Sequence, residues 1–254
     1  MIRRKSSEEI ERIRASCQIV YHVQKALAEQ LQPGVTTLQL DKLAEQVVRD
    51  HGAVPAFKGY RDFPATICAS PNAQVVHGIP DDTPLREGDI ISIDVGAHLD
   101  GYFGDGAFTA GVGEIDPGTQ HLIDVTRTCL ELAIDQARPD RHLTDISHAV
   151  QAHAEKWKMS IIRQFGGHGI GRSLHEEPHI NNYGPPGQGP RLRTGFVFAI
   201  EPILSLGSPD LEIGDDGWTT TTTDGLPAAH CEHTVAITEN GPDILTLPPG
   251  AELP

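Results

Sequence analysis

The feature that most constrains the fold is the order in which helix-like and strand-like patterns of apolar residues follow one another along the chain. Helical spacing of apolar residues recurs in four segments, at residues 6–32, 36–51, 119–137 and 144–157. After each pair of such segments come short apolar runs separated by Gly, Pro, Asn and Asp, which predict strands and loops. Two helices and then β structure, twice over, predict an α+β chain. The pattern alone supports an internal duplication and a coincidental order about equally.

Local signals set the ends of the first two helices. Ser6 and Glu9 have the spacing of a capping box, so the first helix should begin directly after Ser6. Thr36 or Thr37 should cap the second helix, and Gly52 should end it.

A hairpin is predicted by a strand from Asp89 to Val95 and a return strand from Tyr102 to Thr109. A two-residue turn at Asp100-Gly101 would place Asp94 diagonally across from Asp105, and a turn shifted by one residue would place them directly opposite. In both registers the two carboxylates share one face, roughly 4.5–8 Å apart. Like charges there destabilise a sheet unless a cation lies between them, and the apolar run around Asp94 makes an unpaired carboxylate costly.

The second half of the chain offers complementary side chains. His168 stands in a glycine-rich loop, Gly-Gly-His-Gly-Ile-Gly, where the backbone can approach a ligand closely. Glu201 ends one apolar run and Glu232 precedes another, and acids at buried strand ends need partners. Four carboxylates and one imidazole favour Mn, Fe(II), Co or Zn in a shared two-metal site over a structural zinc site.

One motif points to different chemistry and is rejected. The segment His175-Glu-Glu-Pro-His179 satisfies the H-E-x-x-H pattern of single-zinc metalloproteases, which requires both imidazoles on one face of a helix. Pro178 would remove a helical hydrogen bond and would favour an extended backbone at Glu177. We therefore expect no helical zinc site there.

Charge and cysteine usage limit the partners. The 20 basic and 35 acidic residues give a formal charge of −15, which repels polyanions, so we expect no DNA and no membrane partner. The four cysteines are scattered and form no C-x-x-C pair, which favours a reducing compartment over a disulfide framework. With neither a secretory signal nor a spanning apolar stretch of roughly 18 residues, a cytoplasmic protein is expected.

Six motifs, in order and with matching intervals, resemble the signature of the type I methionine aminopeptidases. They are Val76-His77-Gly78-Ile79-Pro80, Ile93-Asp94-Val95 with Gly104-Asp105, Gly167-His168-Gly169-Ile170-Gly171, His175-Glu176-Glu177-Pro178, Ala199-Ile200-Glu201-Pro202 and Glu232-His233-Thr234. The similarity runs over essentially the whole chain. It implies the pita-bread fold, a single catalytic domain (1–254) whose two pseudo-symmetric αβ halves, roughly 1–115 and 116–254, enclose a dinuclear metal site.

The resemblance also implies a ligand set for two divalent metal ions (Co, Mn, Fe(II) or Zn). Asp94 should chelate one ion, and Asp105 and Glu232 should bridge both. His168 and Glu201 should complete the shell of the other ion. Availability in the cell would decide which metal is used.

The activity that the resemblance implies is hydrolysis of the initiator methionine from nascent chains whose second residue is small. A metal-bridging water or hydroxide would attack the scissile carbonyl, and Glu201 would pass a proton to the leaving amine. His77 and His175 should hydrogen-bond the scissile peptide and should not bind metal.

The resemblance implies that the methionine side chain is bound by the residues at the matching positions, Tyr60, Phe63, Cys68, Leu174 and Trp218. Aromatic walls and a sulfur suit a thioether. The chain departs from the family pattern near these positions. Leu174 stands where an aromatic residue is usual, and His230 where Gln is common. Gly96, Gly106 and Ala107 are further departures. These changes bear on substrate preference and metal affinity rather than on the ligand set.

Two alternative functions remain at this level. Prolidases and proline-specific aminopeptidases share the fold, but they normally carry an extra N-terminal domain for which 254 residues leave no room. A non-catalytic pita-bread binding module would normally have lost several ligands, and here all five are present. The family further implies a monomer that meets N-termini of nascent polypeptides at the ribosome.

Overall fold

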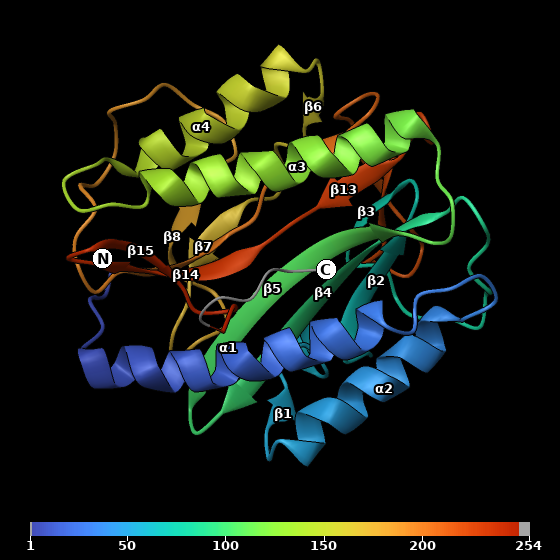
Figure 1. Ribbon diagram of the computed structural model, residues 1–254, viewed down its shortest axis with the longest axis horizontal. Helices are drawn as coiled ribbons and strands as arrows, with labels where there is room; N and C mark the ends of the chain where they lie inside the picture. Colours follow the sequence, from blue (N-terminus) through green and yellow to red (C-terminus); the bar gives the residue numbers. More distant parts are fainter. Residues whose placement is uncertain (1, 249–254) are drawn as a thin grey trace.

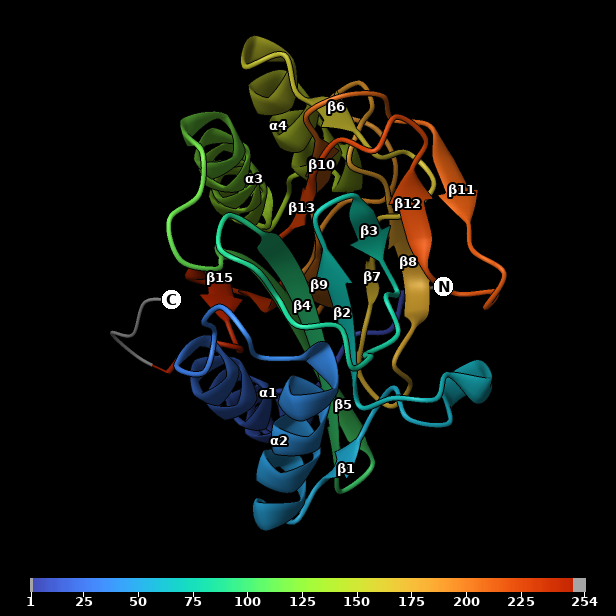
Figure 2. The ribbon, with the colours of Figure 1, turned by 90° about the vertical axis from the view of Figure 1, so that its right-hand side faces the viewer.

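The computed structural model describes residues 2–248 and places two helix pairs on one side of the β-structure (Figures 1 and 2). The helices are α1 (Ser7–Ala28), α2 (Thr37–Asp50), α3 (Pro117–Gln136) and α4 (Leu143–Lys156), with a short 3₁₀ turn, η1 (Tyr60–Asp62). The predicted order of two helices before each set of strands is confirmed. In the described part of the chain, no helix is long and apolar enough to cross a membrane.

The helix ends follow their capping residues. The capping box of Ser6 and Glu9 is present in both directions, and Thr36 forms an equivalent box with Gln39. α1 ends at Ala28, earlier than its apolar pattern extends. Asp116 caps α3, which begins at Pro117, two residues before the start at Thr119 that the sequence indicated.

The strands of the first half form a four-stranded antiparallel sheet in which β4 is central. β4 pairs with β1, β2 and β5, and β3 joins a small sheet with two strands of the second half. Their bounds are β1 (Val54–Pro55), β2 (Ile67–Pro71), β3 (Gln74–Val76), β4 (Ile90–Leu99) and β5 (Tyr102–Gly111).

The second half builds a five-stranded sheet in the order β15-β14-β9-β7-β8 and two small sheets, β13-β10-β6 and β11-β12-β3. The strands are β6 (Ser160–Ile161), β7 (Gly167–Gly169), β8 (Glu176–Ile180), β9 (Val197–Ile200), β10 (Ile203–Ser205), β11 (Leu211–Ile213), β12 (Thr220–Thr222), β13 (Ala228–His230), β14 (His233–Thr238) and β15 (Gly241–Ile244).

Backbone hydrogen bonds join the two large sheets beside the predicted site. The N–H of Ala107 donates to the carbonyl of Glu232, and the N–H of Glu232 donates to the carbonyl of Ala107. Because Ala107 lies on β5 and Glu232 directly precedes β14, this reciprocal pair holds an acid of the second half against the predicted hairpin of the first.

The hairpin has the register that the Asp-Gly turn predicts. Leu99 pairs with Tyr102, so Asp100 and Gly101 form the two-residue turn, both with positive φ, as a type I′ turn requires. β4 continues beyond the predicted end at Val95 to Leu99 at the turn, and β5 begins at Tyr102 as predicted but extends beyond Thr109 to Gly111.

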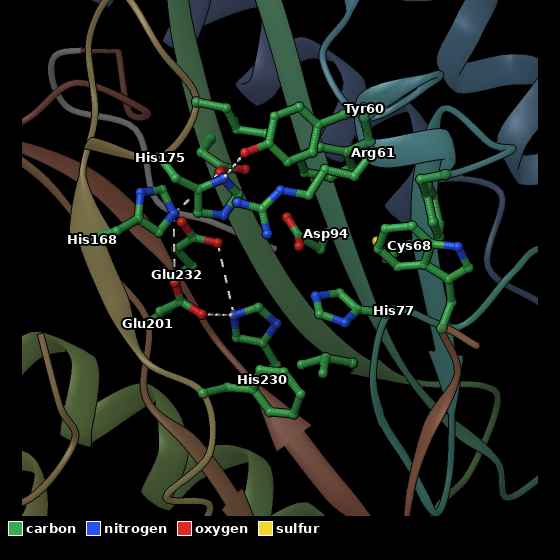
Figure 3. Close-up of a pocket in the computed structure, with 17 residues that line it drawn as sticks. Tyr60, Arg61, Cys68, His77, Asp94, His168, His175, Glu201, His230 and Glu232 are labelled. Carbon is green, nitrogen blue, oxygen red and sulfur yellow. Dashed lines mark hydrogen bonds and ion pairs between the residues drawn. The ribbon is translucent and has the colours of Figure 1, made fainter. Parts of the chain in front are cut away.

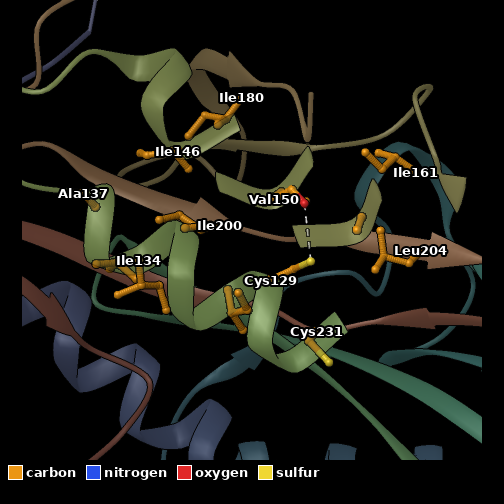
Figure 4. Packing of buried hydrophobic residues seen from close by; sticks show 14 of the residues in the cluster. Cys129, Ile134, Ala137, Ile146, Val150, Ile161, Ile180, Ile200, Leu204 and Cys231 are labelled. Atoms are coloured by element: carbon orange, nitrogen blue, oxygen red, sulfur yellow. Dashed lines mark hydrogen bonds between the residues drawn. The ribbon is translucent and has the colours of Figure 1, made fainter. Parts of the chain in front are cut away.

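Two buried clusters support the sheets from the helix side. One packs α3 and α4 against β9 and β10 (Figure 4), and the other packs α1 and α2 against β4. All four cysteines are buried and free, as their scattered positions predicted. Neither cluster reaches the face on which the acidic residues gather.

Candidate active site

A cavity of about 150 Å³ between the two large sheets collects the residues that the sequence singled out (Figure 3). All twelve predicted site residues line it: Tyr60, Phe63, Cys68, His77, Asp94, Asp105, His168, Leu174, His175, Glu201, Trp218 and Glu232. They come from both halves of the chain, as expected for a site between them.

The predicted metal ligands point their donor atoms at one another. Nε2 of His168 lies 3.7 Å from Oδ2 of Asp105 and 3.7 Å from Oε1 of Glu201. One donor atom from each of Asp105, His168 and Glu232 lies within 4.8 Å of the others. The side chains of Asp105, Glu201, Glu232 and His168 are all at least 87% buried. This spacing suits donors around a shared cation.

His168 lies on a strand, not in the loop that the sequence predicted. It occupies β7 and pairs with Ala199 of β9. A Cβ at Gly167 would lie 2.4 Å from the carbonyl oxygen of Ala199, and one at Gly169 would lie 2.2 Å from that of Glu177. Glycine is therefore required on both sides of His168, because the neighbouring backbone packs so closely against β7 that no side chain would fit.

The ring of His168 is oriented by its own backbone. Nδ1 lies 2.9 Å from the carbonyl oxygen of Gly169, which leaves Nε2 for the carboxylates. Burial lowers the pKa of His168 to about 3, so the ring is neutral and its Nε2 lone pair is available.

The carboxylates lack the partners that buried charges require. Oδ1 of Asp94, Oδ1 of Asp105 and Oε1 of Glu232 have no hydrogen-bond partner among residues 2–248. Burial raises the pKa of all three, and of Glu201 as well; the neighbouring acids raise those of Asp105, Glu201 and Glu232 further. Such a cluster is stable only when it holds protons or cations. The donor set therefore fits divalent metal ions.

Two further histidines line the same cavity. His175 packs against the ring of His168 with centroids 4.3 Å apart, and its Nδ1 lies 3.0 Å from the hydroxyl of Tyr60. Burial, with Arg61 and His77 nearby, lowers the pKa of His175 to about 4. His77 has a left-handed backbone (φ 59°) and stands edge-on to Phe165, and burial lowers its pKa.

The predicted methionine-binding residues form one apolar wall of the cavity. Phe63 meets Trp218 edge to face at 5.2 Å, and Cys68 and Leu174 are buried in the same cluster. Tyr60 differs from the expectation of a wall residue alone, since its hydroxyl also bonds His175. The H-E-x-x-H segment lies largely in strand β8, so the rejection of a helical zinc site is confirmed.

His230 was expected, as a departure from the family pattern, to affect substrate preference or metal affinity, and it lines the cavity; that it faces two of the acids was not predicted. Nε2 of His230 lies 3.7 Å from Oε2 of Glu201 and from Oε2 of Glu232. The available signal was the strand period of two, because His230 and Glu232 face the same side of extended backbone. Arg61, which also lines the cavity, gave no local signal.

Comparison with known proteins yields consistent matches. The metallopeptidase family M24 profile matches residues 11–239. The chain is 46% identical to methionine aminopeptidase 1 of Bacillus subtilis over 97% of its own length and 99% of the relative's. The crystal structure of methionine aminopeptidase from Thermotoga maritima superimposes with a TM-score of 0.96 at 42% identity, covering 98% of this chain and 100% of that one. Prolidase from Pyrococcus furiosus is more distant, with a TM-score of 0.79 at 25% identity over 96% of this chain and 65% of that one.

Proposed function

Since the chain belongs to metallopeptidase family M24 and, within it, to the methionine aminopeptidases, we propose that it hydrolyses the peptide bond after an N-terminal methionine. The observation that carries this function is the convergence of five metal-ligand candidates and two neutral histidines on one cavity with an apolar wall. The two alternatives are disfavoured: prolidase is the more distant structural relative, and a binding module has no need of a complete ligand set.

The proposed cofactor is a pair of divalent ions drawn from Co, Mn, Fe(II) and Zn. Asp94, Asp105 and Glu232 would hold one ion, and His168 and Glu201 would hold the other together with the two bridging acids. The unpartnered oxygens of Asp94, Asp105 and Glu232 support this assignment. When bound, such ions lower the pKa of water and polarise a carbonyl group.

The chain's own residues would hold the substrate and move the proton. Tyr60 bonds Nδ1 of His175, which leaves Nε2 of that ring for the scissile peptide. His77, neutral and braced by Phe165, would make a second hydrogen bond to the same peptide. The raised pKa of Glu201 suits a carboxyl that takes up a proton and delivers it to the leaving amine.

Methionine would lie against Phe63, Cys68, Leu174 and Trp218, and a small second residue would fit next to it. We further propose that the protein works in the cytoplasm, as a monomer, on nascent chains leaving the ribosome. One catalytic domain, with halves of roughly 1–115 and 116–254, would carry the whole activity.

The experiment that tests the function compares two tripeptides. Protein supplied with Mn, Co or Fe(II) should release methionine from Met-Ala-Ser and leave Met-Lys-Ser intact. A chelator should abolish the release, and adding back one of these metals should restore it. Failure of every metal to yield activity on Met-Ala-Ser would overturn the proposal.

A further inference from the structure

His230 places an unpaired imidazole nitrogen inside the carboxylate cluster. The residue is 2% exposed, and in the part of the chain that the structure describes its Nε2 has no hydrogen-bond partner. That atom lies 3.7 Å from Oε2 of Glu201 and 3.7 Å from Oε2 of Glu232, and Figure 3 shows the ring directed at both acids. A separation of 3.7 Å is too long for a hydrogen bond, so the nitrogen lacks the partner that burial demands.

The backbone of His230 is fixed on both sides. Its N–H donates to the hydroxyl of Thr109 at 2.9 Å, and that hydroxyl donates to the carbonyl oxygen of His230 at 2.8 Å. On β13 the residue pairs with Ile203 of β10, two residues after Glu201. The strand pairing and the Thr109 bonds therefore direct the ring into the site.

His168 provides an internal comparison. Its Nε2 lies 3.7 Å from Oε1 of Glu201, the same separation that His230 keeps from the other oxygen of that carboxylate. Two donors at this distance can both reach an ion that lies about 2.1 Å from each. The Glu201 carboxylate thus lies 3.7 Å from each of two imidazole nitrogens, although only His168 belongs to the proposed ligand set.

We infer that Nε2 of His230 is a further nitrogen donor to the ion that Glu201 and Glu232 bind. The inference rests on the proposed metal centre and adds a ligand to it. The ion between these acids would then have two imidazoles, His168 and His230. A second nitrogen strengthens binding of Zn²⁺ or Co²⁺ more than binding of Mn²⁺, which prefers oxygen ligands.

The first test counts the imidazoles around the metal, and the result for the natural protein is decisive. Metal-free protein is loaded with one equivalent of Zn²⁺, and X-ray absorption fine structure reports the histidine scattering. Two imidazoles per zinc are expected in the natural protein and one in His230→Gln. A single imidazole in the natural protein would overturn the inference.

Metal affinity supplies the second readout. In His230→Gln, competition with a chelator should show Zn²⁺ binding weakened by about 10–100-fold, with a clearly smaller change for Mn²⁺. A merely structural role would weaken both ions alike, and that result would also overturn the inference. His233→Gln is the matched control, because His233 is also a buried histidine, but its Nδ1 lies 2.7 Å from the hydroxyl of Thr246.

The outcomes separate this inference from the proposed function. If the natural protein bound no divalent ion at all, the metal centre itself would be wrong, and His230 would fall with it. If it bound zinc through one imidazole and cleaved Met-Ala-Ser, the function would stand and only the role of His230 would fail. If His230→Gln did not fold, the imidazole count in the natural protein would decide alone.

Discussion

Asp94 lies diagonally across the β4–β5 hairpin from Asp105, since Asp94 pairs with Ala107 while Asp105 pairs with Gly96. Both side chains face the cavity, and each has an oxygen, Oδ1, that finds no hydrogen-bond partner among the described residues. The sheet thus holds two buried carboxylates side by side, which costs free energy unless protons or cations lie with them. These two carboxylates therefore lower the stability of the metal-free fold and provide oxygen donors for a cation.

Asp105→Asn should therefore separate stability from metal binding. Removing one buried charge should make the chelated variant unfold at a higher temperature than the chelated natural protein. Its metal affinity should fall by more than the roughly 10–100-fold seen for residues that only support a ligand. Thermal unfolding with chelator and calorimetric metal titration measure the two effects. A chelated variant that melts below the natural protein would contradict this account of the site.

The pH dependence of the chelated protein should reflect the same cluster. Burial raises the pKa of Asp105, Glu201 and Glu232 in the folded state. Their contribution to stability is complete below the unfolded pKa and is lost as pH rises through the raised folded values. The free energy of unfolding should thus fall as pH rises above the unfolded carboxyl values of about 4, by up to about 1.4 kcal/mol per pH unit for each group that titrates, until the raised folded values are passed.

The buried histidines have the opposite sign and act at lower pH. Because burial lowers the pKa of His168 and His233, their contribution is lost only as pH falls below the unfolded value of about 6.5. Saturating Mn²⁺ should reduce the loss of unfolding free energy that the carboxyl groups cause as pH rises, since the ion replaces the protons. Urea unfolding over a pH series, with and without metal, measures this. If Mn²⁺ left the fall of unfolding free energy with rising pH unchanged, groups other than these acids would cause it.

The hairpin could be predicted from sequence because its determinants are local. An Asp-Gly pair between apolar runs fixes a turn type, the turn fixes the register, and the register fixes which side chains share a face. The predicted ligand pair Asp94 and Asp105 followed from twelve consecutive residues, 94–105. The capping boxes at Ser6 and Thr36 are local in the same way.

What the sequence could not show depends on contacts between distant segments. The flanks of His168 were taken for a loop because nothing local reveals that Ala199 and Glu177 approach those glycines. The hydrogen bond between Tyr60 and His175 joins residues 115 positions apart. His230 lies two residues before Glu232, yet its place between the acids depends on where β10 and β5 hold the strand.

His77→Ala should retain metal and lose turnover. In the proposed mechanism the ring bonds the scissile peptide and no ion, so its loss should lower kcat by about 10²–10⁴-fold. Calorimetry should give metal binding equal to that of the natural protein. Loss of metal by this variant would show that the role assigned to His77 is wrong.

Tyr60→Phe tests the hydrogen bond that orients His175. The hydroxyl lies 3.0 Å from Nδ1, and such a bond contributes about 1 kcal/mol. Its loss should lower kcat by roughly 5–10-fold, with KM and metal content nearly unchanged. Tyr183→Phe is the control, because that ring packs against Arg163 and does not line the cavity. An equal loss of activity in both variants would argue against a specific role.

Glu176→Gln should weaken the fold in a way that disappears in acid. Nζ of Lys5, 3% exposed, lies 2.8 Å from Oε2 of Glu176. Burial alone would raise the pKa of Glu176, but the bond from Lys5 and two backbone N–H donors lower it overall. A lowered carboxyl pKa contributes stability above the unfolded value of about 4.5, which is lost as pH falls through the folded value.

The variant leaves the Lys5 ammonium buried without its counter-charge, so it should lose about 2–4 kcal/mol at neutral pH. Urea unfolding should show this difference shrinking as pH falls below about 4.5, because the natural protein then loses the same interaction. A difference that stays constant over this range would mean that the ion pair does not supply it.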